Sequence, residues 1–240
     1  MTAPDEPSPS SPSPSGGRFP AFGHGRRAPF IVFEGIEGSG KSTQILRLSF
    51  LLGQAACPHL VTREPGGTPL GDALRELLLS TAGAGIDGLT ELYLLEAARR
   101  THVRQVIRPA LDRGVAVLCD RFGDSSVAYQ GGGRELGPEL VEALNEQATG
   151  GLVADVTILL DLPVEIGLAR VGRRGRAEDR MEREALVFHQ RVRKAYLETA
   201  QRRGTSYRVV AAEHDPDAVF AEVLLHLRPF LGDGLPPARP

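Results

Sequence analysis

The stretch Gly35-Ile36-Glu37-Gly38-Ser39-Gly40-Lys41-Ser42 decides the fold of this 240-residue chain. It matches the phosphate-binding loop pattern G-x-x-x-x-G-K-[ST], in which backbone N–H groups and a lysine hold nucleotide phosphates and a hydroxyl holds Mg²⁺. The apolar run 30–33 precedes it, and a segment with helical character, 43–48, follows it. This order of strand, glycine turn and helix favours a nucleotide site over a glycine-rich turn with a chance lysine.

Five short apolar runs predict the strands of a parallel sheet. Several are continuous and rich in β-branched residues, which is typical of strands buried on both faces. Segments with helical spacing separate them, among them the long periodic stretch 90–111. This alternation predicts an α/β fold of the P-loop NTPase type, with a five-stranded parallel sheet flanked by helices. The predicted strands cover residues 30–34, 59–62, 115–120, 156–161 and 207–210.

The overall charge and the cysteine content exclude several classes of protein. The chain carries 28 Lys and Arg against 30 Asp and Glu, a formal net charge of −2. This balance offers no electrostatic basis for binding nucleic acid or a membrane surface. The two cysteines, Cys57 and Cys119, are too few for a disulfide framework or a metal cluster, and they favour a reducing cytoplasmic location. No apolar run is long enough to cross a bilayer.

The N-terminal segment differs in composition from the rest of the chain. Residues 1–17 are dominated by Pro and Ser, so they can bury too little apolar surface to offset the entropy lost on ordering. We interpret residues 1–28 as a disordered tail, or as the product of a start codon placed too early; a docking arm is less favoured. Residues 29–232 form the predicted P-loop domain, and 233–240 a flexible C-terminus.

Side chains suited to phosphate chemistry follow the predicted strands. Ligands of open α/β sheets bind beyond the carboxyl ends of the strands, where Arg63, Asp120 and Arg121 stand. Asp120 is predicted to hold Mg²⁺ together with the Ser42 hydroxyl; a strand-end cap is the alternative role of Asp120. Arg63 and Arg121 are predicted to converge on one phosphate, against the alternative of two surface ion pairs.

A short basic stretch, Gly-Arg-Arg-Gly-Arg at residues 172–176, lies between two predicted helices. Mobile basic loops can close over phosphates, so residues 172–180 are a predicted lid, with a solvated turn as a serious competitor. Asp179 and Glu182 have the spacing of a capping box for the last long helix. His102 is expected on a polar helix face, and Cys119 in the core.

Together these motifs resemble the thymidylate kinases, nucleoside monophosphate kinase-like enzymes that phosphorylate dTMP. The phosphate-binding loop alone indicates only a nucleoside triphosphate. The Arg-Glu-Pro-Gly-Gly and Ala-Tyr-Gln-Gly segments, in this order, are far more specific. The resemblance extends from residue 30 to about residue 197, and its matching segments are 34–44, 62–68, 96–99, 120–122 and 125–131.

The resemblance implies a role for each matching position. Arg99 would contact the thymine edge, and Tyr129 would pack where a ribose 2′-hydroxyl would sit, which favours deoxyribose. The phosphate-binding loop lacks the arginine that some members carry there, so lid arginines are implied, with Arg173 as a further candidate. The implied sets are Lys41, Arg121, Arg174, Arg176 and Glu37 for catalysis; Gly35, Ile36, Glu37, Gly38, Ser39, Gly40, Lys41, Ser42 and Thr43 for ATP; Arg63, Leu95, Arg99, Arg121, Ser125, Ser126, Tyr129 and Gln130 for dTMP; and Ser42 and Asp120 for the metal.

Leu95 departs from the family pattern. Members usually carry a phenylalanine there that stacks on the base, and a leucine without a ring weakens base binding by about 0.5–1.5 kcal/mol. Tyr93 is predicted to face elsewhere on the helix.

The resemblance implies the reaction ATP + dTMP giving ADP + dTDP, with Mg²⁺. This reaction supplies dTTP for DNA synthesis. The resemblance also implies that the protein forms a homodimer. A kinase of another nucleoside monophosphate and a non-catalytic nucleotide-binding regulator are the alternatives. The regulator is disfavoured because Lys41, Ser42, Asp120 and Arg121 are all present.

Overall fold

A five-stranded parallel sheet forms the centre of the structure, a computed structural model that describes residues 27–80, 83, 85–173, 179–182 and 184–232. The spatial order of the strands is β2-β3-β1-β4-β5, and every neighbouring pair is parallel. The strands are β1 (Phe30–Glu34), β2 (His59–Arg63), β3 (Ala116–Asp120), β4 (Val156–Asp161) and β5 (Tyr207–Ala211).

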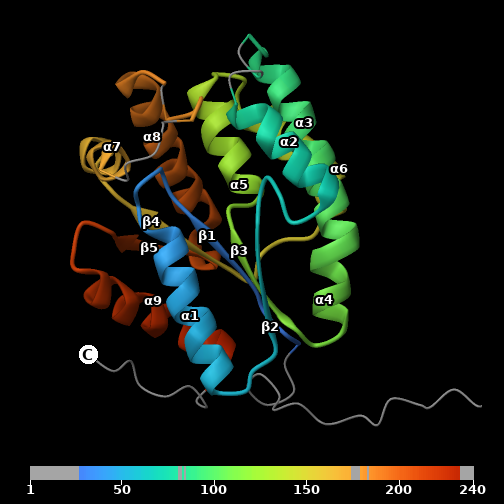
Figure 1. Ribbon diagram of the computed structural model, residues 1–240, viewed down its shortest axis with the longest axis vertical. Helices are drawn as coiled ribbons and strands as arrows, with labels where there is room; N and C mark the ends of the chain where they lie inside the picture. The colour runs from blue at the N-terminus through green and yellow to red at the C-terminus, as the bar shows by residue number, and fades with distance from the viewer. Residues whose placement is uncertain (1–26, 81–82, 84, 174–178, 183, 233–240) are drawn as a thin grey trace, which may run out of the picture.

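Helices connect the strands and cover the sheet (Figure 1). Parallel neighbours need such crossovers, because the chain must return to the same end of the sheet before each new strand. The helices are α1 (Lys41–Gln54), α2 (Pro69–Leu79), α3 (Gly88–His102), α4 (Arg108–Asp112), α5 (Gly123–Ser126), α6 (Pro138–Thr149), α7 (Val164–Gly172), α8 (Leu186–Arg203) and α9 (Pro216–Leu231). Two π-helical segments, Val103–Ile107 and Val127–Gly133, continue α3 and α5, and a 3₁₀ turn, Gly204–Ser206, precedes β5.

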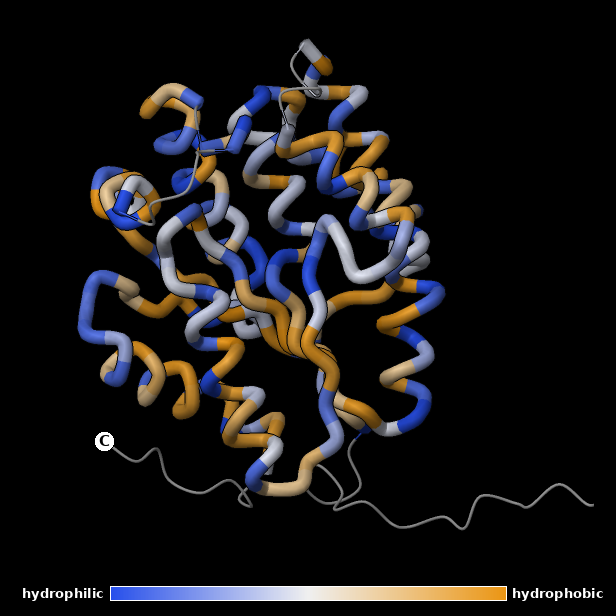
Figure 2. Tube along the Cα trace, viewed as in Figure 1, coloured by the Kyte–Doolittle hydropathy of each residue, from blue (hydrophilic) through white to orange (hydrophobic). Residues whose placement is uncertain are grey.

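The central strand β1 packs on both of its faces. Ile31 and Phe33 belong to the largest apolar cluster, which includes side chains of α1, α8 and α9. Phe30 and Val32 belong to a second cluster with Val103 and the residues around α4. In Figure 2, hydrophobic residues are concentrated at the centre of the sheet, where β1 lies. The continuous apolar runs of the sequence therefore mark strands covered on both sides.

The strand order predicts a ligand-binding crevice at the carboxyl end of β1. The chain runs from β1 toward β2 and β3 on one side and toward β4 and β5 on the other, and ligands of open α/β sheets bind where the connections diverge. Among the described residues, no helix combines the length and the apolar character needed to span a membrane.

The five predicted strands and their parallel arrangement are confirmed, with ends that differ by at most one residue. The predicted helix over 90–111 is present as α3, its π-helical continuation and α4. The predicted capping box is wrong as a cap of the last long helix. Asp179 and Glu182 do exchange backbone N–H hydrogen bonds, but α8 begins only at Leu186, after Ala185.

Candidate active site

The phosphate-binding loop joins β1 to α1 in a shape that requires glycine. Gly35, Gly38 and Gly40 have φ angles of 137°, 76° and 96°, a region that L side chains rarely adopt. A Cβ atom on Gly38 would lie 2.3 Å from the Gly167 carbonyl oxygen, so the loop also packs tightly against α7. Helix α1 starts at Lys41, directly after Gly40, so its first N–H groups and the positive end of its dipole form an anion site.

Lys41 and Ser42 place a cation and a hydroxyl beside this loop. Lys41 Nζ donates to the carbonyl oxygens of Gly35 and Ile36 at 2.9 and 3.0 Å. Burial lowers the pKa of Lys41 to about 8, and the positive charge of Arg121 acts in the same direction. Ser42 Oγ donates to Asp120 Oδ2 at 3.0 Å. Two oxygen ligands from α1 and β3 thus meet at the loop, and a hydroxyl with a carboxylate is a donor set that suits Mg²⁺.

Arg121 follows β3 and contacts the phosphate-binding loop through Glu37. Its φ angle of 70° is left-handed. Nη2 donates to Glu37 Oε1 at 2.9 Å and to the Tyr129 hydroxyl at 3.0 Å, while Nη1 donates to the Tyr196 hydroxyl at 2.9 Å. Burial opposes the charge of this guanidinium, yet Tyr129, Tyr196 and Glu37 hold the pKa of Arg121 well above its ordinary value. The group therefore presents a fixed positive charge to the site.

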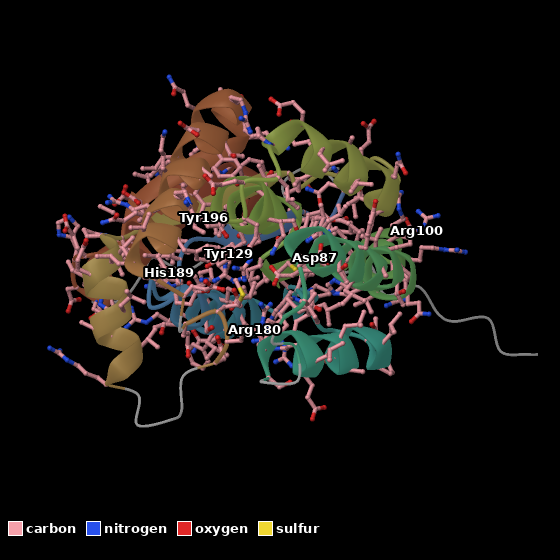
Figure 3. The ribbon with its side chains drawn as sticks, turned by 90° about the horizontal axis from the view of Figure 1, so that it is seen from above. Asp87, Arg100, Tyr129, Arg180, His189 and Tyr196 are labelled. Carbon is pink, nitrogen blue, oxygen red and sulfur yellow. The ribbon has the colours of Figure 1, made fainter. Side chains whose placement is uncertain are left out.

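Glu37 receives hydrogen bonds from both Arg121 and Tyr129. The Tyr129 hydroxyl lies 2.6 and 2.7 Å from its two oxygens. Burial raises the pKa of Glu37, but Arg121 and Lys41 outweigh it and lower the pKa below its ordinary value. His189 Nδ1 lies 3.7 Å from Glu37 Oε2. In Figure 3, the side chains of Tyr129, Tyr196 and His189 gather in one region of the molecule, away from Arg100.

A buried acid, Glu34, holds the turn that carries Arg121. Its carboxylate accepts from the backbone N–H groups of Phe122 and Ser125 at 2.8 and 3.2 Å. It also accepts from the Ser125 hydroxyl at 2.6 Å and the Tyr196 hydroxyl at 2.9 Å. Burial raises the pKa of Glu34 to about 7. The last residue of β1 therefore fixes the start of α5 and the side-chain partners of Arg121.

Two further arginines, Arg63 and Arg75, line the cavity that Lys41 and Arg121 line. Arg63 is half exposed and lies 3.4 Å from Asp72, so one weak ion pair leaves it open to a ligand. Arg75 Nη1 donates to the Pro65 carbonyl oxygen at 3.3 Å. Burial lowers the pKa of Arg75, and so do the charges of Arg63 and Arg121. Such mutual repulsion favours binding of an anion among the three guanidinium groups.

Arg99 lines the same cavity and is 2% exposed. Five hydrogen bonds occupy its five N–H groups: Nε to Glu64, Nη1 to Glu96 and Asn145, and Nη2 to the Phe122 carbonyl oxygen and the Ser126 hydroxyl. A guanidinium group has no further donor. In this arrangement Arg99 is a packed wall of the cavity and has no N–H left for a base edge.

His102 takes part in the same buried network, so its predicted place on a polar helix face is wrong. Its ring is fully buried; Nδ1 lies 2.9 Å from Glu64 Oε1 and Nε2 lies 2.7 Å from the Thr62 hydroxyl. His102 thus fixes Glu64, which in turn holds Arg99. The sequence around His102 does not indicate this burial, because the hydrogen-bond partners of His102 are Thr62 of β2 and Glu64, the residue after β2.

One cavity brings together most of the residues expected from the sequence. Gly35, Ile36 and Ser39 do not line it and contribute to the loop behind it. Arg174 and Arg176 lie outside the described residues. The expected residues that line the cavity are Glu37, Gly38, Gly40, Lys41, Ser42, Thr43, Arg63, Leu95, Arg99, Asp120, Arg121, Ser125, Ser126, Tyr129 and Gln130. Tyr93 is exposed and does not line the cavity, whereas Leu95 does, so Tyr93 faces elsewhere on the helix, as predicted.

Sequence reasoning missed several residues of the cavity. Arg75, Leu78 and Leu79 come from α2, Glu91 from α3, and Arg180 and Met181 from the segment before α8. Arg75 follows the Arg-Glu-Pro-Gly-Gly segment on a predicted helix. Its positive charge close to that segment could have indicated a further phosphate contact. Arg180 had no signal, because its partners are distant in the sequence.

Comparison with known proteins supports the geometry. The family model described as thymidylate kinase matches residues 33–223. A thymidylate kinase of Nitratidesulfovibrio vulgaris is 48% identical over 88% of this chain and 100% of its own length. One of Caulobacter vibrioides is 50% identical over 81% of this chain and 93% of its own. A crystal structure of thymidylate kinase from Ehrlichia chaffeensis superimposes with a TM-score of 0.69 at 32% identity and covers 85% of this chain and 99% of that one. With its P-loop, its arginine-lined cavity and this similarity along most of its length, the chain belongs to the thymidylate kinase family.

Proposed function

We propose that this protein transfers the γ-phosphoryl group of ATP to dTMP, giving ADP and dTDP, and thereby supplies dTTP for DNA synthesis. The observation that carries the proposal is one cavity that is lined both by the phosphate-binding lysine and by buried polar side chains. Lys41 and Ser42 of α1 line it, and so do the buried side chains of Arg99 and Gln130. Arg63, Arg75 and Arg121 line the cavity as well, and guanidinium groups are well suited to the phosphate of an acceptor nucleotide.

The proposed roles follow the position of each group. The loop amides of residues 35–43 and Lys41 hold the ATP phosphates. Arg63 and Arg121 hold the dTMP phosphate in line with them, so that the two nucleotides meet without a covalent intermediate. Glu37 holds Arg121 and Tyr129 in place and faces the dTMP sugar. Leu95, Ser125, Ser126, Tyr129 and Gln130 form the sugar and base pocket with Arg99 as its wall.

The charge that develops during transfer is neutralised by fixed cations. Lys41 and Arg121 supply two of these, and Arg174 and Arg176 supply the rest from a lid over residues 172–180, with Arg173 adjacent. Ser42 and Asp120 would hold Mg²⁺, which would lower the negative charge on the phosphates when bound. The support for the metal is the 3.0 Å contact between two oxygen ligands.

Oligomeric state and location are proposed on separate grounds. We propose a homodimer, on the resemblance to the family. We propose a cytoplasmic location because Cys57 and Cys119 are both free thiols, as expected in a reducing compartment.

A panel of acceptors tests the function directly. Purified full-length protein is incubated with ATP and Mg²⁺ and with dTMP, dUMP, dCMP, dGMP or AMP, and ADP release is followed in a coupled assay. We expect dTMP to give the highest kcat/KM. A preference for a different acceptor would identify a kinase of another nucleoside monophosphate. ATP binding without acceptor-dependent ADP release would identify a non-catalytic regulator.

A further inference from the structure

Glu91, near the start of α3, is a buried acid that the proposed chemistry does not use. It is 2% exposed and lines the cavity. Its Oε1 accepts a hydrogen bond from Gln130 Nε2 at 2.6 Å. Its Oε2 is paired with Arg180 Nη2 and, at 3.5 Å, with Arg134 Nη2. Two guanidinium groups thus hold the carboxylate against the Gln130 amide.

The contact with Glu91 decides which end of the Gln130 amide is free. An ionised carboxylate only accepts hydrogen bonds, so the NH₂ end of the glutamine must face it. The opposite orientation would set two acceptor oxygens against each other. Gln130 is 3% exposed and lines the cavity, and its Oε1 has no hydrogen-bond partner within the described parts of the chain. A buried acceptor without a partner is costly unless a ligand completes it.

The free acceptor Gln130 Oε1 can select between pyrimidine bases by the group at N3. Thymine and uracil carry a hydrogen on N3 and can donate to it, whereas the N3 of cytosine is itself an acceptor. Arg99 cannot replace this acceptor, because a guanidinium group has only N–H donors. The reading of the N3 position therefore depends on the orientation of Gln130.

We propose that Glu91 is a positioning residue that sets base specificity: by fixing the amide of Gln130, it makes the site accept a base with an N3–H group and reject cytosine. The proposal rests on the proposed function, because it takes a nucleoside monophosphate in this cavity as given. Arg180 secures the arrangement. Its Nε donates to the Leu78 carbonyl oxygen at 2.7 Å, and its backbone N–H donates to the Leu79 carbonyl oxygen at 3.1 Å, so it is tied to α2 as well as to Glu91.

The test is the substitution Glu91→Gln, which keeps the size of the side chain and replaces the carboxylate by an amide. An amide can donate to Gln130 Oε1, so Gln130 is free to turn and present its NH₂ group to the base. We expect the ratio of kcat/KM for dTMP over dCMP to fall by roughly tenfold to a hundredfold. The fall should include a rise in kcat/KM for dCMP itself, a gain that general damage to the structure would not produce.

The matched control is Glu184→Gln. Glu184 pairs with Arg134 at 2.7 Å but does not line the cavity. This variant loses an ion pair next to the network and keeps the Glu91–Gln130 hydrogen bond, so its dTMP to dCMP ratio should equal that of the unchanged protein. Thermal unfolding of both variants establishes that they are folded.

A second measurement uses the unchanged protein, so it does not depend on the folding of a variant. N3-methyl-dTMP has no N3–H group, and we expect it to compete with dTMP at least about tenfold more weakly than dUMP does. Equal competition by N3-methyl-dTMP, or an unaltered dTMP to dCMP ratio in folded Glu91→Gln, overturns the proposal. If the unchanged protein phosphorylates none of these acceptors, the proposed function fails instead.

Discussion

Arg121 Nη2 lies 2.9 Å from Glu37 Oε1, so the arginine that follows β3 is paired with the acid inside the phosphate-binding loop. The pair joins the two sides of the site, because Glu37 belongs to the β1–α1 loop and Arg121 to the β3–α5 connection. The Tyr129 hydroxyl contacts both residues, at 3.0 Å from Arg121 and 2.6 Å from Glu37. The phosphate-binding loop and the β3–α5 connection are thereby held in one geometry.

The first prediction concerns the fork geometry of Arg121. In Arg121→Lys the charge remains, but one ammonium group cannot reproduce the separate contacts to Glu37, Tyr129 and Tyr196. We expect kcat/KM for dTMP to fall by roughly 10²–10³-fold, measured by coupled ADP release. Arg100→Lys, an exposed position on α3 outside the cavity, is the control and should retain full activity. Activity of Arg121→Lys close to that of the control would contradict the assigned role.

The second prediction concerns Lys41 and pH. Its lowered pKa of about 8 means that the free site loses this positive charge as pH rises through about 8. Bound phosphates favour the charged form, so ATP affinity should be constant below that pH and decline above it. Arginine stays charged over this range, so Lys41→Arg should bind ATP with no such decline. Calorimetric titration between pH 7 and 9.5 measures the difference.

The same lysine also tests catalysis. In Lys41→Ala we expect kcat to fall by at least about 10²-fold, while circular dichroism and the unfolding midpoint show an intact fold. Near-normal turnover in this variant would show that Lys41 does not have the proposed catalytic role.

The third prediction concerns Glu34, whose pKa is raised by burial to about 7 from an ordinary value of 4.5. Between these two values the folded protein keeps a proton that the unfolded chain releases, so this group makes the free energy of unfolding decrease as pH rises from 4.5 to 7. At about 1.4 kcal/mol per pKa unit, the decrease is roughly 3 kcal/mol. Urea unfolding at several pH values should show this slope in the unchanged protein.

Glu34→Gln cannot titrate, so its unfolding free energy should lack that part of the slope. Glu213→Gln, at an exposed position, is the control and should keep it. An identical pH dependence in Glu34→Gln and in the unchanged protein would rule out the raised pKa.

The fourth prediction concerns the proposed metal ligands. Ser42→Ala and Asp120→Asn each remove one of the two oxygens that lie 3.0 Å apart. We expect each substitution to raise the Mg²⁺ concentration for half-maximal activity by about tenfold, measured by titrating Mg²⁺ at fixed ATP. The control is Ser49→Ala. Ser49 lies on the same helix, but its hydroxyl is hydrogen-bonded to His59 at 2.8 Å, so this substitution should leave the midpoint unchanged. A midpoint unaltered in Asp120→Asn would exclude that carboxylate as a ligand.

Local patterns in the sequence predicted the elements that carry their own signals. Several of the strands are continuous apolar runs, and the number and parallel direction of the strands follow from their alternation with helices. The phosphate-binding loop is a pattern of contiguous residues. Its glycines are needed because the backbone has positive φ angles, which the structure shows at Gly35, Gly38 and Gly40. The positions of Arg63, Asp120 and Arg121 followed from a single rule, that ligands meet the carboxyl ends of parallel strands.

The interior partners of the side chains did not follow from such patterns. His102 was expected on a polar face, and it is buried against Thr62 and Glu64. Arg99 was expected to read the base, and the structure surrounds it with acceptors from four different segments. Arg180 reaches Glu91 from 89 residues away in the chain.

The amino-acid sequence by itself determined the sheet, the nucleotide loop and the family, because each depends on residues that are adjacent or regularly spaced. Only the tertiary structure decided how Glu91 orients Gln130 and how Glu34 holds the turn that carries Arg121. The physical reason is that a hydrogen bond between buried groups depends on the distance and direction between atoms from separate elements, and packing brings these together only when the whole sheet has formed.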